Sequence, residues 1–366
     1  MTRWQPAKRT LALTIAAALM AFAMTGCALQ DQPDDGTTAE EEATIEEYRQ
    51  ALVSEEDLKM EYKEDSEMST ASGALGAKRS GMGLLTADIV ISTSVALVHH
   101  ARVIHAVTHL PPTRVSKDRA VWEGTDDGLF LRLGIDRKQV PKGYRYRYRV
   151  KARPQGKKNA KLRTIFGGWV VRMGPKGHHH GKPGFGVARY HFDNFDKLRP
   201  NKKFSGKVRV AFRRAGGVHQ VVVKAIDAAT PEDPDFPPLA KYSYTLLPNT
   251  AGSLRWFSKG DFNKDNKKPL ENVAMHARWR SDKSGVAAGV AMDGTLKHDY
   301  LSVAECWNGR LFKTYGFLGW PKGQTEEGKR GACTRNPDKL SAPKFKSNMQ
   351  NTDPSVPKKH PKEKTL

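Results

Sequence analysis

Short segments of alternating apolar and polar residues follow one another along much of the chain, from residue 120 to residue 307. Glycine, proline and asparagine separate them, and a period of two residues is typical of strands that bury one face. The segments are 120–123, 129–135, 144–152, 164–173, 186–193, 207–213, 218–226, 242–247, 253–258, 273–280, 286–292 and 302–307. Since no helical pattern of useful length intervenes, we expect a mainly β protein, an antiparallel barrel or sandwich.

A proline-rich break at residues 231–238 divides this β-rich part into an N-terminal region, 84–230, and a C-terminal region, 239–335. Two subdomains and one continuous β unit would both fit such a break. Lysine and proline dominate the sequence that follows. We therefore expect residues 336–366 to form a basic, disordered tail.

One amphipathic helix is expected ahead of the first strand. Apolar residues recur with a helical period from Ile89 to Leu110, Thr86 is placed to cap the first turn, and two prolines end the pattern. His105 and His109 share one face of this helix, but no HExxH glutamate lies between them. We interpret them as part of its polar stripe.

The first residues have the character of a secretory signal. A basic start precedes an apolar stretch that ends at Met24, and the sequence Met-Thr-Gly leads into Cys27. This ending resembles the lipobox of bacterial lipoproteins, although the usual lipobox has leucine where this chain has Met24. The resemblance implies that residues 1–26 are a cleaved signal peptide and that Cys27 carries the lipid anchor. The protein would then be exported and held in the cell envelope, with the outer membrane favoured over the inner one.

Acidic side chains dominate the next segment. Between Asp31 and Glu67 there are 15 acidic and three basic residues. Strong charge with little apolar surface does not offset the entropy of ordering, so we expect residues 27–80 to be a disordered spacer. From Met68 onward there are 55 basic and 24 acidic residues. The body is thus far more basic than the net charge of +22 for all 366 residues indicates.

The chain has three cysteines. With Cys27 assigned to the lipid, Cys306 and Cys333 remain. An exported chain folds where disulfides form, so we expect these two to make a structural disulfide. Two unpaired thiols are the alternative.

The most informative strand begins at Tyr144, because it alternates strictly between aromatic or apolar residues and cations. Its cations are Arg145, Arg147, Arg149, Lys151 and Arg153, and a second strand repeats the pattern with Lys207, Arg209 and Arg213. These residues predict a cationic sheet face that binds an anionic partner, such as anionic lipid, lipopolysaccharide or a cell-wall polymer. The alternative is a solvated basic face that prevents edge pairing.

Two other patterns are weak metal candidates. Three adjacent histidines lie in a glycine-rich loop, and a second loop resembles the first half of a calcium-binding loop without its bidentate glutamate. The residues are His178, His179, His180, Asp261, Asn263 and Asp265. The chain has no GxSxG, HExxH or Walker motif and no well-placed GxGxxG. We therefore expect no catalytic residues and no cofactor, and no specific nucleic-acid partner.

These features together resemble the uncharacterised β-rich envelope lipoproteins of Gram-negative bacteria, which share an acidic tether and a helix ending in Leu-Pro-Pro-Thr, here Leu110–Thr113. The leading hypothesis is a membrane-anchored, non-enzymatic binding or scaffold protein. A carrier that holds an apolar ligand or lipid inside a β-barrel is the first alternative. A hydrolase with an unrecognised site is the second.

Overall fold

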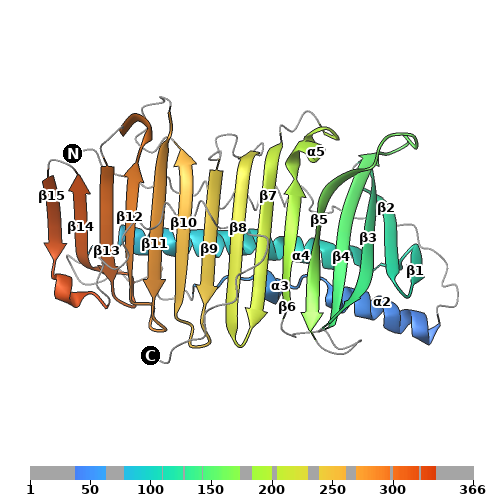
Figure 1. Cartoon of the computed structure of the whole chain (residues 1–366), viewed down its shortest axis with the longest axis horizontal. Helices are drawn as coiled ribbons and strands as arrows, with labels where there is room; N and C mark the ends of the chain where they lie inside the picture. Colours follow the sequence, from blue (N-terminus) through green and yellow to red (C-terminus); the bar gives the residue numbers. More distant parts are fainter. Residues whose placement is uncertain are drawn as a thin grey trace.

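One sheet of fifteen strands dominates the computed structural model, which describes residues 38–62, 78–108, 110–126, 128–141, 143–173, 184–199, 204–229, 239–260, 269–296, 300–320 and 323–334. Each strand pairs in antiparallel fashion with its neighbours in the sequence, so the sheet is a continuous meander (Figure 1). The expected mainly antiparallel β class is confirmed.

The strands are β1 (Arg114–Ser116), β2 (Arg119–Asp126), β3 (Leu129–Val140), β4 (Gly143–Pro154), β5 (Arg163–Met173), β6 (Gly184–His191), β7 (Ser205–Ala215), β8 (Val218–Ala229), β9 (Leu239–Leu246), β10 (Gly252–Gly260), β11 (Glu271–Trp279), β12 (Gly285–Met292), β13 (Tyr300–Trp307), β14 (Lys313–Trp320) and β15 (Gly323–Gly328). The alternating segments correspond to β2 through β13, whereas β1, β14 and β15 were not expected.

The sheet is continuous and open. Strands β8 and β9 pair directly across the proline-rich break, so the β-rich part is one unit. Among the described residues, no pairing joins β1 to β15. The expectation of a barrel or a sandwich is thereby refined to one open sheet with two edges.

Helix α4 (Gly81–Thr108) crosses one side of the sheet, roughly perpendicular to the strands (Figure 1). Its first turn is fixed at β13, where Ser80 Oγ donates to Glu305 Oε2 at 2.7 Å. Beyond its other end, Trp122 of β2 donates its indole N–H to the Leu110 carbonyl at 2.9 Å. We call the side that carries this helix the inner face and the opposite side the outer face.

The cap of α4 differs from the prediction. Ser80 Oγ accepts the backbone N–H of Gly83 at 2.9 Å, as an N-cap does. Thr86 lies inside the helix, and its hydroxyl donates to the Met82 carbonyl. The helix therefore begins six residues, nearly two turns, before the position expected from Thr86. None of the described helices is both long and apolar enough to cross a membrane.

The acidic segment before α4 is folded where the structure describes it, which corrects the prediction of a disordered spacer over residues 27–80. Residues 39–51 form α2 (Ala39–Ala51) and residues 55–58 form α3 (Glu55–Leu58). Tyr48, Leu52 and Leu58 are fully buried against the inner face. Their burial, together with two buried ion pairs described below, offsets the entropy of ordering that the charge content alone does not. Residues 27–37 and 63–77, like the signal 1–26 and the tail 336–366, lie outside the described residues.

The inner face is a packed core of large side chains. Tyr146, Tyr148, Tyr242, Tyr244 and Phe212 of the sheet are fully or almost fully buried there. Val90, Leu97 and Ile104 of α4 belong to the same apolar cluster. A short helix, α5 (Phe192–Asp196), adds Phe195 to this cluster.

Cys306 and Cys333 form a disulfide, the pairing predicted from the sequence. Cys306 lies on β13 and is fully buried, and Cys333 follows the short helix η4 (Arg330–Ala332). Around them Val286 and Tyr315 make a small apolar cluster. The bridge therefore fastens the segment after β15 onto the sheet.

Candidate anion-binding face

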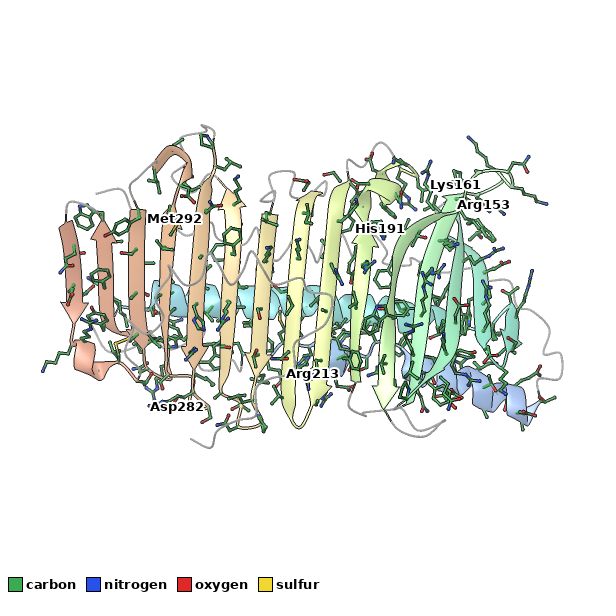
Figure 2. All side chains as sticks on the ribbon, in the orientation of Figure 1. Arg153, Lys161, His191, Arg213, Asp282 and Met292 are labelled. Carbon is green, nitrogen blue, oxygen red and sulfur yellow. A yellow bond between two sulfur atoms is a disulfide. The ribbon has the colours of Figure 1, made fainter. Side chains whose placement is uncertain are left out.

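The side chains of β4 alternate between the two faces of the sheet, as the sequence predicted. Tyr146 and Tyr148 are buried on the inner face, while the cations occupy the outer positions. Arg145 and Arg147 are exposed, and the other three are half-buried. Figure 2 shows Arg153 near the upper end of its strand. The outer positions of β4 carry Arg145, Arg147, Arg149, Lys151 and Arg153.

Lys207, Arg209 and Arg213 of β7 lie on the same face as the β4 cations. The register shows this. Arg209 pairs with Arg189 of β6, Arg189 pairs with Gly167 of β5, and Gly167 pairs with Arg149 of β4. Arg213 lies at the lower end of β7 in Figure 2, far from Arg153 at the upper end of β4. The predicted cations are thus brought to one face but spread widely over it.

Further cations occupy outer positions that the sequence analysis did not single out. Four strands contribute only one each, so no pattern within a strand marks them. The additional residues are Arg189 of β6, Lys224 of β8, Lys241 of β9, Arg255 and Lys259 of β10, and Arg278 of β11. Only the order and register of the strands reveal that they share a face with the β4 cations.

Five of these cations lie in a single line across six adjacent strands. Consecutive ladder partners run from Arg149 through Gly167 to Arg189, and on through Arg209 and Lys224 to Lys241. We call Arg149, Arg189, Arg209, Lys224 and Lys241 the cation row. Beyond β9 the same line continues as Phe257, Ala274 and Val290, so its charged part ends there.

Carboxylates are confined to the margins of the outer face. At the outward ladder positions of β4 to β13, the described residues include no aspartate or glutamate. Near one edge, Glu123 accepts a hydrogen bond from Arg132, and Asp136 pairs with Arg119 at 3.5 Å. The central outer face is therefore cationic without neutralising side chains in its ladder.

The pKa values of two groups on this face reflect the local charge. Burial lowers the pKa of Lys241, and the neighbouring Lys224 lowers it further. Burial also lowers the pKa of His191, with additional contributions from Lys207 and Arg189. Burial is the larger cause of both shifts, and the neighbouring cations act in the same direction because they disfavour a further positive charge.

His276 shows the strongest effect of this kind. It is almost fully buried on the outer side of β11, where burial first, then Arg255 and Arg278, lower its pKa to about 3. Arg278 Nε lies 3.3 Å from His276 Nε2, in a geometry where the neutral imidazole accepts the hydrogen bond. The ring is neutral at the pH of most environments.

This gives a pH-dependent prediction for His276→Gln. The folded pKa lies below the ordinary 6.5, so the unfolded chain takes up a proton at a higher pH than the native chain does. Stability is then lost as pH falls from about 6.5 toward 3. We expect the wild type to lose about 2–3 kcal/mol more than His276→Gln between pH 7 and pH 4. Urea unfolding at both pH values measures this difference. Equal losses of stability in the wild type and in His276→Gln would mean that His276 does not have a lowered pKa in the folded protein.

A shallow depression of about 500 Å³ opens near the β3–β4 end of the sheet. Arg145, Arg147, Asp118 and Asp136 are among the residues that line it. Mixed charges surround this depression, in contrast with the uniformly positive cation row. We therefore do not include this depression in the candidate anion-binding site.

Two buried ion pairs hold α2 and α3 to the inner face. Glu47 accepts hydrogen bonds from Arg137 at 2.6 Å and from the Tyr146 hydroxyl at 2.7 Å. Asp57 accepts two from Arg172, at 2.5 and 3.0 Å, which makes a bidentate pair. Both pairs are almost completely shielded from solvent.

The surroundings of these pairs indicate a structural role. Burial and the Glu47 carboxylate raise the pKa of Tyr146, so its hydroxyl stays a donor. Arg172 also donates to the carbonyls of Ala51 and Leu52, and His219 contacts the Asp57 carbonyl at 2.8 Å. The polar groups are therefore satisfied by one another, within a closed core.

The remaining sequence candidates have different outcomes. The metal candidates His178, His179, His180, Asp261, Asn263 and Asp265 all lie outside the described residues. Within the described ranges, no group of histidines, cysteines and carboxylates is arranged to hold a metal ion. The carrier hypothesis needed a hollow barrel interior, whereas the sheet is open and its inner face is filled by side chains and helices.

Comparisons with known proteins add no relative. No protein-family model, no curated protein and no solved structure matches the chain.

Proposed function

We propose that the protein is a non-enzymatic binding or scaffold protein of the cell envelope, anchored to the membrane by lipid at Cys27, whose outer face binds anionic envelope material. The observation that carries this proposal is the outer face from β4 to β11. Fourteen strand cations lie on this face, and apart from Asp136 of β3, the ladder partner of Arg147, no described carboxylate stands opposite any of them in the ladder. Such a surface attracts polyanions through the summed potential of its charges.

The cost of this arrangement supports a binding role. Like charges that lie directly opposite each other on neighbouring strands destabilise a sheet. Arg189 faces Arg209, which faces Lys224, which faces Lys241. A face whose purpose was solubility would avoid these pairings by alternating charges of both signs.

The folded acidic segment limits how far the body can lie from the proposed anchor. Only residues 28–38 separate Cys27 from the start of α2 at Ala39. Fully extended, this stretch spans at most roughly 40 Å. The sheet would therefore stay close to the membrane surface and to the polymers that lie there. Mass spectrometry of the mature N-terminus tests the anchor, and an unmodified Cys27 would refute it.

The binding proposal predicts salt-sensitive association with polyanions. We expect the full chain to be retained on immobilised lipopolysaccharide or a phosphate-rich cell-wall polymer at low salt and to be released as salt rises. A neutral polysaccharide support is the matched control and should retain nothing. Absence of binding at low salt, or binding that is insensitive to salt, would contradict the proposal.

A further inference from the structure

The cation row holds five of the fourteen strand cations of the outer face, and its two sides differ. The adjacent line of ladder partners begins at Arg147 and continues as Trp169, Val187, Ala211 and Val222. The cation row thus has an apolar border along one side, from β5 to β8. The line on the other side of the row includes His191 and Lys207, so only one side of the row is apolar.

The charges in the row repeat with the spacing of the strands. Neighbouring strands lie about 4.8 Å apart, so the four cations of β6 to β9 begin at about this separation, while Arg149 lies two strands from Arg189. The one position without a charge, Gly167, is covered by Arg149: a Cβ built on this glycine would lie 3.4 Å from Arg149 Cγ. The row is therefore continuous in space from β4 to β9.

Arg149 also has an unused donor. Its Nε is buried and has no hydrogen-bond partner, although a buried donor ordinarily has one. No ion pair joins Arg149, Arg189 or Lys224 to a described carboxylate. These three side chains retain the capacity to bind an anion.

We propose that the cation row binds a linear polyanion that runs across the strands from β4 to β9, with the apolar border contacting the backbone of that polymer. This inference rests on the proposed function of the outer face and specifies the chemistry of its partner. A flexible chain with an anionic group at every repeat matches a one-dimensional track of cations. A membrane surface presents headgroups in two dimensions and would leave the apolar border against polar headgroups.

The test compares two triple variants of the full chain that lose the same charge. The row variant is Arg149→Gln, Arg189→Gln and Lys224→Gln. The control variant is Lys157→Gln, Lys158→Gln and Lys161→Gln, which neutralises three exposed lysines in the β4–β5 hairpin. Binding of fluorescent inorganic polyphosphate is measured over a range of salt concentrations, alongside vesicles of phosphatidylglycerol and phosphatidylcholine.

We expect the row variant to bind polyphosphate at least about tenfold more weakly than the control variant. The slope of log affinity against log salt should become shallower by about 2, as the loss of three contacts to a single-stranded polyanion implies. The Tm of the row variant should stay the same or rise, because like charges are removed from opposed positions. A loss of binding would then not result from unfolding.

Other outcomes have separate meanings. If the wild type binds polyphosphate and both variants bind it equally more weakly, the cation row is not the specific binding site, although the basic outer face still binds polyanions. If wild type binds only the anionic vesicles, the partner is a lipid surface and the linear polymer is overturned. If wild type binds neither probe, the proposed function itself fails.

Discussion

Replacing Asp57 with alanine should lower the free energy of unfolding by about 3–5 kcal/mol. The Asp57 carboxylate holds Arg172, whose side chain is 3% exposed, through two hydrogen bonds. Without it the guanidinium remains buried with only the carbonyls of Ala51 and Leu52 as acceptors. An uncompensated buried charge is among the most costly defects in a core.

Glu56→Ala is the matched control, because this neighbouring residue of α3 is exposed and carries the same charge. We expect it to change stability by less than about 1 kcal/mol. The double variant Asp57→Leu, Arg172→Met should recover much of the loss, since it removes both charges. Chemical unfolding measures all three. Equal effects of the two single substitutions would mean that α3 is not docked on the inner face.

Trp307→Ala should be comparably destabilising, by about 3–5 kcal/mol. The indole is 1% exposed and donates its N–H to the Lys283 carbonyl at 2.8 Å. It fits between two glycines: a Cβ on Gly83 of α4 would lie 3.1 Å from the ring, and one on Gly285 would lie 2.4 Å away. This side chain therefore seats the first turns of α4 against the sheet, and its removal leaves a large cavity there.

The control for this substitution is Trp320→Ala on β14. Trp320 is 38% exposed, so its truncation removes much less buried surface and should cost less than about 1.5 kcal/mol. Thermal or urea unfolding compares the two. If Trp307→Ala were no more destabilising than Trp320→Ala, the contact between α4 and the sheet would be weaker than the structure indicates.

The strands were largely predictable because each central strand has a protein core on one side only. This geometry produces alternation with a period of two, which is visible in the sequence. Strand β15 escaped detection because all six of its residues are exposed, so it has no apolar positions. In β14, glycines at 316 and 319 interrupt the alternation.

The docking of the acidic segment could not be predicted from its composition. Glu47 and Asp57 resemble any other carboxylate in a charged stretch. Their partners, Arg137 and Arg172, lie 90 and 115 residues further along the chain. Only the folded sheet brings these charges together, and composition contains no information about such long-range pairs.

The candidate site was predicted in part, for a related reason. Five cations within β4 create a pattern inside one strand, whereas Lys224 and Lys241 are single residues on β8 and β9. Their alignment depends on strand register, which is shifted by irregularities such as the one between Val150 and Lys151. A row that runs across strands is invisible until that register is known.

If the outer face is the surface that binds the polyanion, its lysines should become inaccessible when the polymer is bound. Lysine acetylation of the full chain, with and without polyphosphate, locates that surface directly by mass spectrometry. We expect polyphosphate to protect Lys207, Lys224 and Lys259 of the outer face, while Lys117 and Lys158 in the turns react as before. Protection of the turn lysines or of lysines after residue 335, with the outer-face lysines unchanged, would contradict the claim.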